Sequence, residues 1–261
     1  MGGPGSFEQL LSEAEREPFQ GWDFSYVHER MAEESSPWDY CEIVRESLRR
    51  AESVIDLGTG GGELLSSLGP LPRRAFATEG YLPNLPVARR RLRPLGVELV
   101  ATFCDDNTKS SQKGALPFRS NSVDLVINRH EAFVADEICR VLRRPGKFVT
   151  EQVGDACHPE LFAALGLATP TDSSRWNLQT AAAQLAAAGL HITSSREALL
   201  ETRFMDVGAV AYYSKAVVPL WIPGFSPDGY RDRLREIHEK IQKEGSFRIT
   251  IPCFFVQAEK D

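Results

Sequence analysis

The sequence predicts an α/β fold built on a parallel sheet, and three observations lead to this prediction. Short apolar segments that suit strands alternate with helical segments between residues 53 and 153. The first apolar segment, residues 53–57, runs directly into a glycine-rich turn at residues 58–62 and then into a helical segment. The chain has 261 residues, enough for one domain with an elaboration or for two small domains. Strands and helices that alternate at this spacing indicate right-handed βαβ crossovers, and hence parallel strands.

The first half of the pattern contains five strand candidates. We expect strands at residues 53–57, 74–79, 97–103, 122–128 and 147–153. Helical spacing predicts helices at residues 85–92 and 135–142, and Pro145-Gly146 ends the second of these before the fifth strand. Residues 105–114 show no apolar period, so we expect an exposed loop there.

The segments on either side of this pattern are less regular. Amphipathic spacing predicts helices at residues 6–17 and 37–50, with an aromatic-rich stretch at residues 21–28 between them. After residue 153, we expect helices at residues 159–167, 177–188 and 230–243, and extended strands at residues 190–205 and 247–257. A hairpin would need only a short turn between these last two strands, so the aromatic stretch between them is an insertion.

Composition and charge narrow the class of protein. Apolar residues make up 42% and charged residues 25%, which is typical of a soluble globular chain. The formal net charge of −6 argues against a long nucleic-acid partner, which usually requires a basic face. No apolar run approaches the roughly 20 residues needed to span a membrane. The first residues lack the layout of a signal peptide, so we expect a cytoplasmic protein.

Cysteines and histidines give no sign of a metal site. The five cysteines are scattered without a close pair, which indicates reduced thiols rather than a disulfide framework or a zinc site. The histidines also lack the spacing of metal ligands. We therefore expect no bound metal.

The glycine-rich turn is the clearest candidate binding site. Asp56 lies next to the end of the first strand, and Gly58, Thr59, Gly60 and Gly62 follow that strand. Glycine adopts positive φ angles and lets a ligand approach the backbone without a Cβ in the way. The helix that follows offers unpaired N–H groups to an acceptor. The turn therefore predicts a nucleotide-like cofactor, and its glycine spacing differs from the Gly-x-Gly-x-x-Gly pattern of dinucleotide sites.

These elements resemble the class I S-adenosylmethionine (SAM)-dependent methyltransferases. Asp56-x-Gly58-x-Gly60-x-Gly62 is similar to the glycine-rich SAM loop of that family, and Glu79 matches its acidic residue at the end of the second strand. Residues 141–148 resemble its helix, turn and fifth strand, although Lys147 stands where many relatives carry a second glycine. The resemblance implies a Rossmann-like sheet of seven mostly parallel strands with helices on both faces. It also implies SAM as the cofactor.

The resemblance also implies roles for individual residues. Glu79, followed by Gly80, corresponds to the side chain that binds the two ribose hydroxyls of SAM. Asp105 or Asp106 occupies the place where relatives contact the adenine amino group. Asn128 and Arg129, after the fourth strand, correspond to the segment beside the methionine half of the cofactor.

His130 is the candidate catalytic residue, with two readings. It stands next to Glu131 after the fourth strand and is a possible general base. Alternatively, it only shapes the pocket, because methyl transfer depends mainly on in-line positioning and needs a base only when the nucleophile arrives protonated.

The acceptor is predicted from the segments outside the sheet. We expect a small-molecule acceptor and a substrate pocket lined by Tyr26, His28, Glu131, Tyr212 and Trp221. Aromatic side chains suit a small apolar or planar acceptor, although the same residues could instead form a core or an interface. Two other functions stay open: an RNA or protein methyltransferase, and a non-catalytic SAM-binding subunit.

These expectations divide the chain into four parts. Residues 1–50 form an N-terminal helical lid, residues 51–205 the SAM-binding domain, residues 206–245 an aromatic helical cap, and residues 246–261 the last strand of that domain.

Overall fold

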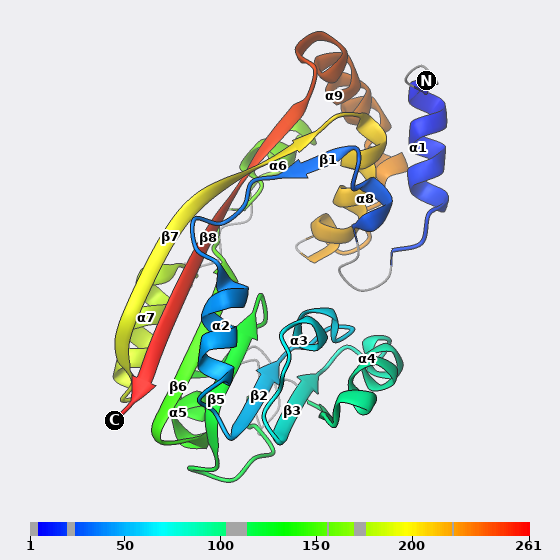
Figure 1. Ribbon diagram of the computed structural model, residues 1–261. Helices are drawn as coiled ribbons and strands as arrows, with labels where there is room; N and C mark the ends of the chain where they lie inside the picture. Colours follow the sequence, from blue (N-terminus) through cyan, green and yellow to red (C-terminus); the bar gives the residue numbers. More distant parts are fainter. Residues whose placement is uncertain (1–4, 20–23, 103–113, 156, 170–175, 221) are drawn as a thin grey trace. The chain divides into compact units, whose positions relative to one another are not determined.

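The computed structural model describes residues 5–19, 24–102, 114–155, 157–169, 176–220 and 222–261. The chain divides into two compact units (Figure 1). The sheet unit consists of residues 37–154, 175–198 and 253–261. The helical unit consists of residues 1–36, 155–174 and 199–252. Strands β7 (His191–Phe204) and β8 (Phe247–Lys260) contribute residues to both units.

The sheet unit contains a mostly parallel sheet. Its strands are β2 (Ser53–Leu57), β3 (Arg74–Glu79), β4 (Glu98–Ala101), β5 (Val123–Arg129) and β6 (Leu142–Val153), together with parts of β7 and β8. The strand order is β7-β8-β6-β5-β2-β3-β4. Strands β2 to β6 pair in parallel, and β8 is antiparallel to β6. This order is typical of the Rossmann-like methyltransferase sheet, so the predicted fold class is confirmed.

Helices cover both faces of this sheet. The helical elements of the unit are α2 (Tyr40–Leu48), α3 (Glu63–Ser67), α4 (Asn84–Leu92), η2 (Arg93–Leu95), α5 (Ala135–Val141) and α7 (Leu178–Ala187). Neighbouring residues of a strand point to opposite faces, and β8 marks the two faces clearly. Phe255 packs on Trp38, just before α2, whereas Phe254 packs on Trp176, just before α7.

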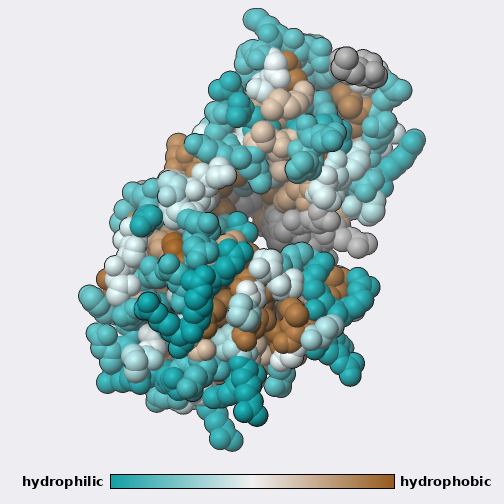
Figure 2. All heavy atoms as spheres, viewed as in Figure 1, coloured by the Kyte–Doolittle hydropathy of each residue, from teal (hydrophilic) through white to brown (hydrophobic). Residues whose placement is uncertain are grey.

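The core of the sheet unit lies on the face that α5 and α7 cover. Leu57, Val126 and Phe148 are fully buried there, on three adjacent strands. Burying each such side chain contributes roughly 1.5–3 kcal/mol to folding. Hydrophilic residues make up most of the surface seen in Figure 2. The apolar segments that the sequence assigns to strands therefore correspond to buried strands of the sheet.

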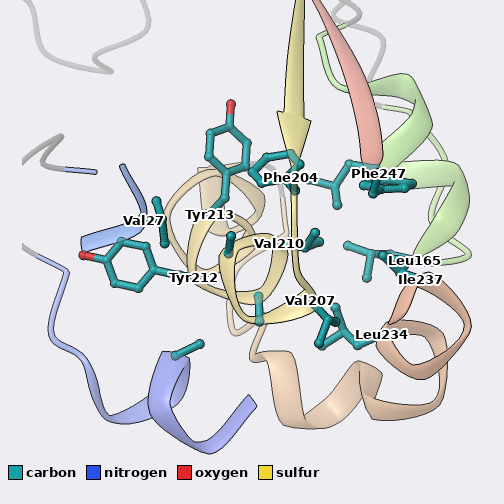
Figure 3. Packing of buried hydrophobic residues seen from close by; sticks show 14 of the residues in the cluster. Val27, Leu165, Phe204, Val207, Val210, Tyr212, Tyr213, Leu234, Ile237 and Phe247 are labelled. Carbon is teal, nitrogen blue, oxygen red and sulfur yellow. The ribbon is translucent and has the colours of Figure 1, made fainter. Parts of the chain in front are cut away.

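The helical unit is built around one hydrophobic cluster. Its elements are α1 (Phe7–Arg16), η1 (Ser25–Val27), β1 (Met31–Glu33), α6 (Pro159–Ala164), α8 (Val207–Val217), η3 (Val218–Leu220), η4 (Pro227–Tyr230) and α9 (Arg231–Glu244). Ser6 and Gln9 form a capping box that starts α1, and Asp206 caps α8. Figure 3 shows Phe204, Val210, Ile237 and Phe247 among the side chains of the cluster.

Within the described part of the chain, no helix has both the length and the apolar character needed to cross a membrane.

The structure differs from the expected elements in three places. Strand β6 begins at Leu142 and not at residue 147, because Leu142 already pairs with Val123 of β5, so Pro145-Gly146 lies within the strand and does not precede it. Strand β1 was not predicted: it has only three residues, too few for a periodic signal, and it forms because Met31–Glu33 pairs antiparallel with the end of β7. The third predicted strand is shorter than expected, since β4 covers only Glu98–Ala101. The aromatic insertion between β7 and β8 contains helices α8 and α9.

Candidate cofactor site

The glycine-rich turn lies at the carboxyl end of β2. Gly58, Gly60 and Gly62 have φ angles of 65°, 62° and 81°, in the left-handed region that favours glycine. The backbone N–H of Thr59 donates to the Thr78 carbonyl at 2.8 Å, which fixes the turn against β3. A Cβ at Gly58 would overlap the side chain of Glu131, whereas a Cβ at Gly60 would meet nothing within 4 Å. The turn therefore has one closely packed glycine and one that faces open space.

Asp56, at the end of β2, is only 4% exposed. Burial raises the pKa of this carboxyl to about 7, and the nearby charge of Glu79 acts in the same direction. The Thr59 hydroxyl partly offsets these effects by stabilising the carboxylate. Near neutral pH, Asp56 thus changes between its neutral and charged forms.

Glu79 ends β3 and is 6% exposed. Its Oε1 accepts a hydrogen bond from the Tyr81 N–H at 2.6 Å, and its Oε2 accepts one from Asn84 Nδ2 at 3.5 Å. A carboxylate offers about four lone-pair sites, so both oxygens keep capacity for hydroxyl groups. Gly80, which follows Glu79, is half-buried. These contacts orient the carboxylate that the sequence predicts for ribose binding.

Two exposed apolar side chains follow Glu79 and were missed by sequence reasoning. Tyr81 is 59% exposed and Leu82 is 72% exposed. Hydrophobic residues show among hydrophilic ones over the region of β3, α3 and α4 (Figure 2). The sequence signal that could have pointed to them is a pair of large apolar residues shortly after the acid expected to bind ribose.

Asn128 is fully buried near the end of β5. Its Oδ1 accepts hydrogen bonds from Thr150 Oγ1, at 2.8 Å, and from Gln152 Nε2. Among the described residues, its Nδ2 has no hydrogen-bond partner. Gln152 Nε2 also donates to the Glu131 carbonyl at 3.0 Å, which ties the segment after β5 to β6. The amide of Asn128 is therefore held by its oxygen and keeps a buried donor, which requires an acceptor.

The side chain of Glu151, on β6, joins Arg129 to the segment before α2. Glu151 is 3% exposed, and its Oε1 accepts from Arg129 Nε at 2.7 Å. Its Oε2 accepts from Trp38 Nε1 at 2.6 Å. On α2, Tyr40 donates its hydroxyl to the Asn128 carbonyl at 3.1 Å, and burial raises the pKa of Tyr40 well above its usual value. Neither Glu151 nor Tyr40 stands in a motif or periodic pattern that would mark it as a site residue.

His130 has a left-handed backbone, with a φ angle of 61°. Its N–H donates to the Glu151 carbonyl at 2.9 Å, and its Nε2 lies 3.7 Å from Glu151 Oε1. Partial burial, followed by the positive charge of Arg129, lowers the pKa of His130 to about 4. The Glu151 carboxylate opposes this decrease. The imidazole is therefore neutral at neutral pH.

The other predicted site residues fall in two groups. Asp105, Asp106 and Trp221 lie outside the described residues. Tyr26, His28 and Tyr212 belong to the helical unit, whereas Glu131 belongs to the sheet unit.

In the helical unit, the rings of Tyr26 and Tyr212 pack against each other, with centroids 4.9 Å apart and planes tilted by 52°. Tyr212 is only 2% exposed and donates its hydroxyl to the Pro18 carbonyl at 3.3 Å. Tyr26 and His28 line a hollow of about 480 Å³ together with Ser25, Glu29 and Arg30. Most of the Tyr212 side chain is thus packed in the core, whereas Tyr26 and His28 reach a surface hollow.

Residues 55–150 match a family model described as a methyltransferase domain. The chain carries a SAM-dependent methyltransferase domain. The matched residues run from β2 to β6 and include the glycine-rich turn, Glu79, Asn128 and Arg129. The predicted family, enzyme class and cofactor are therefore confirmed.

Solved structures show that the fold extends beyond these residues. The YcgJ protein from Bacillus subtilis matches with a TM-score of 0.55 and 15% identity, covering 85% of this chain and 97% of that one. A candidate methyltransferase from Bacillus halodurans C-125 matches with a TM-score of 0.53 and 18% identity, covering 85% and 98%. A candidate sarcosine dimethylglycine methyltransferase from Galdieria sulphuraria has a TM-score of 0.50 and 13% identity, covering 84% and 82%. A search of curated protein sequences found no match.

The described residues of the methyltransferase domain suit the cofactor. The open space at Gly60 leaves room beside the turn, and the buried Asn128 amide keeps a donor in need of an acceptor. Glu79 presents a carboxylate with spare lone pairs at the carboxyl end of the neighbouring strand. In open α/β sheets, ligands bind outside these strand ends. Residues from β2, β3 and β5 therefore meet where a nucleotide cofactor is expected.

Proposed function

We propose that this protein transfers a methyl group from SAM to a small-molecule acceptor by in-line SN2 displacement. The observation that carries the proposal is the arrangement at the carboxyl ends of β2, β3 and β5. There the glycine-rich turn, the Glu79 carboxylate and the Asn128 amide come from three neighbouring strands of one sheet.

Each of these residues has a proposed task in binding the cofactor. Glu79 accepts hydrogen bonds from the two ribose hydroxyls, with Gly80 leaving space beside it. Asp56, Gly58, Thr59, Gly60 and Gly62 form the turn over which the cofactor lies. Asn128 and Arg129 contact its amino-acid half, and Asp105 or Asp106 contacts the adenine. When bound, SAM supplies a methyl group on a positively charged sulfur.

His130 is the proposed catalytic residue, and its environment favours a positioning task. A side chain with a pKa of about 4 is a weak base at neutral pH, so it removes a proton only inefficiently. A neutral imidazole can still accept or donate a hydrogen bond to orient an acceptor. In-line attack on a methyl group gains much of its rate from such positioning.

The proposed acceptor is a small molecule, and Glu131, whose side chain lies against Gly58 of the glycine-rich turn, is proposed to line its pocket. The net charge of −6 supports this choice over a nucleic acid. The Galdieria sulphuraria relative is named for a small-molecule acceptor, which also supports the proposal. Its low identity limits the likeness itself to the fold.

Two measurements test this function. Titration calorimetry with SAM and with S-adenosylhomocysteine should detect binding of both, and a protein that binds neither would refute the cofactor assignment. Incubation of the enzyme in cell extract with methyl-labelled SAM should then place the label in the small-molecule fraction. Label in RNA or protein would instead favour a macromolecular acceptor, and binding without any label transfer would favour a non-catalytic subunit.

A further inference from the structure

The contacts of Arg129 suggest a task more specific than general contact with the cofactor. Arg129 and Glu151 face each other across β5 and β6 in the register of the sheet. Glu151 uses one carboxylate oxygen for Arg129 Nε, at 2.7 Å, and the other for Trp38 Nε1, at 2.6 Å. Because Glu151 is 3% exposed and bonded on both oxygens, it is a rigid support for the guanidinium.

This support leaves the far end of Arg129 available. Within the described part of the chain, the Arg129 guanidinium donates a hydrogen bond through Nε alone. The side chain is 44% exposed. The hydrogen bond and charge of Glu151 raise the pKa of Arg129 despite the opposing effect of burial, so the side chain stays cationic. A guanidinium held through Nε presents its two terminal nitrogens as a fork, which matches a carboxylate.

The position of Arg129 indicates which carboxylate it meets. Asn128 pairs with Leu57, so Arg129 follows at the level where Gly58 begins the glycine-rich turn. The acids of this part of the site are Asp56, Glu79, Glu131 and Glu151, and Arg129 is the cation among the residues that the sequence assigns to the cofactor. A bound carboxylate in such acidic surroundings needs a nearby positive charge.

We propose that Arg129, oriented by Glu151 and Trp38, binds the carboxylate at the amino-acid end of the cofactor. The inference rests on the proposed function, and it assigns Glu151 and Trp38 as positioning residues. An acidic acceptor carries the same chemical group, and the two sources of the carboxylate can be distinguished by experiment.

The test compares two nucleosides that differ in this group. S-Adenosylhomocysteine has the amino-acid carboxylate, whereas 5′-methylthioadenosine keeps the nucleoside and the thioether without it. In calorimetry, Arg129→Gln should weaken binding of S-adenosylhomocysteine by about 10- to 100-fold and change binding of methylthioadenosine by less than about twofold. Arg129→Lys should lie between the wild type and Arg129→Gln, because it keeps the charge and loses the fork.

Two further variants test the support of Arg129. Glu151→Gln and Trp38→Phe should each reduce the preference for S-adenosylhomocysteine over methylthioadenosine by about threefold to tenfold. Trp38→Phe removes the indole donor and keeps an aromatic ring at this buried position, so it provides a second test of the support if Glu151→Gln fails to fold. Arg49→Gln is the matched control, because Arg49 pairs with Glu42 on the surface at the other end of α2.

The outcomes separate the two proposals. The carboxylate assignment would be overturned if Arg129→Gln weakened binding of S-adenosylhomocysteine and of methylthioadenosine equally. It would also be overturned if Arg129→Gln weakened binding of neither compound, and that result would point to an acidic acceptor. An unchanged preference in both Glu151→Gln and Trp38→Phe would overturn the positioning role. A wild-type protein that binds neither nucleoside would overturn the proposed function together with this inference.

Discussion

At the scale of single residues, Glu79 is the most direct test of the cofactor site. Glu79→Ala should weaken binding of S-adenosylhomocysteine by at least about tenfold, because the variant loses charge-assisted hydrogen bonds to the ribose hydroxyls. Calorimetry measures the change. Glu98→Ala is the control, since Glu98 is an exposed acid on the edge strand β4. A Glu79→Ala protein that binds as tightly as the wild type would remove Glu79 from the site.

The buried carboxyl of Asp56 predicts a pH dependence of stability. Its pKa is about 7 in the folded protein, against an ordinary value of 3.8. Between these two values the folded protein holds a proton that the unfolded chain releases, so the free energy of unfolding falls as the pH rises. The loss is complete only once the pH has risen above about 7, and it amounts to at most roughly 4 kcal/mol.

The Asp56→Asn variant lacks the titrating carboxyl group, so comparing its stability with that of the wild type tests this prediction. Urea unfolding without cofactor should show Asp56→Asn gaining stability relative to the wild type between pH 5 and pH 7.5. Asp136→Asn, at an exposed acid in the first turn of α5, should show no such trend. If the free energies of unfolding of the wild type and of Asp56→Asn differed by the same amount at pH 5 and at pH 7.5, that result would contradict the raised pKa.

At the scale of elements, the glycine-rich turn offers a matched pair of substitutions. Gly58→Ala and Gly60→Ala both place a Cβ at a φ angle above 60°, which costs about 1 kcal/mol. Only Gly58→Ala also brings that Cβ into the Glu131 side chain. Urea unfolding should therefore show a larger loss of stability for Gly58→Ala, by roughly 1–2 kcal/mol.

Gly60→Ala should instead act on binding. The space beside Gly60 is open, so the added methyl group enters the volume proposed for the cofactor. We expect a folded protein with weaker binding of S-adenosylhomocysteine in calorimetry. Equal stability losses for the two variants, with binding unchanged in Gly60→Ala, would contradict these roles.

The polar ends of β5 and β6 show how two strands build one side of the site. Thr150 and Gln152 bind the Asn128 oxygen from one face of the sheet, while Glu151 binds Arg129 from the other. Residues that alternate along β6 thus support consecutive residues of β5 on opposite faces. One strand end therefore orients both an amide donor and a guanidinium.

At the scale of the whole molecule, the net charge predicts how strongly the protein binds nucleic acid. Its net charge of −6 should keep RNA binding weak and nonspecific. Filter binding at low and moderate salt should detect no complex with mixed tRNA at micromolar concentration. A tight complex that weakens steeply with salt would favour the RNA methyltransferase alternative.

The sequence by itself determined the fold class and the position of the glycine-rich turn, and its resemblance to a known family implied the cofactor. These depend on local periodicity and on residue types within short segments, and such signals survive without knowledge of distant contacts. The resemblance around residues 53–153 also implied cofactor roles for Glu79 and Asn128, which lie at or next to the ends of recognisable strands.

Only the tertiary structure decided which side chains support these residues. Glu151 meets Arg129 because β5 and β6 pair in one particular register, and Trp38 reaches the same carboxylate from 113 residues away in the sequence. Tyr212, expected at a pocket, is mostly packed against Tyr26 and the Pro18 carbonyl. Register, burial and long-range hydrogen bonds arise from the packing of whole elements, so no local pattern in the sequence specifies them.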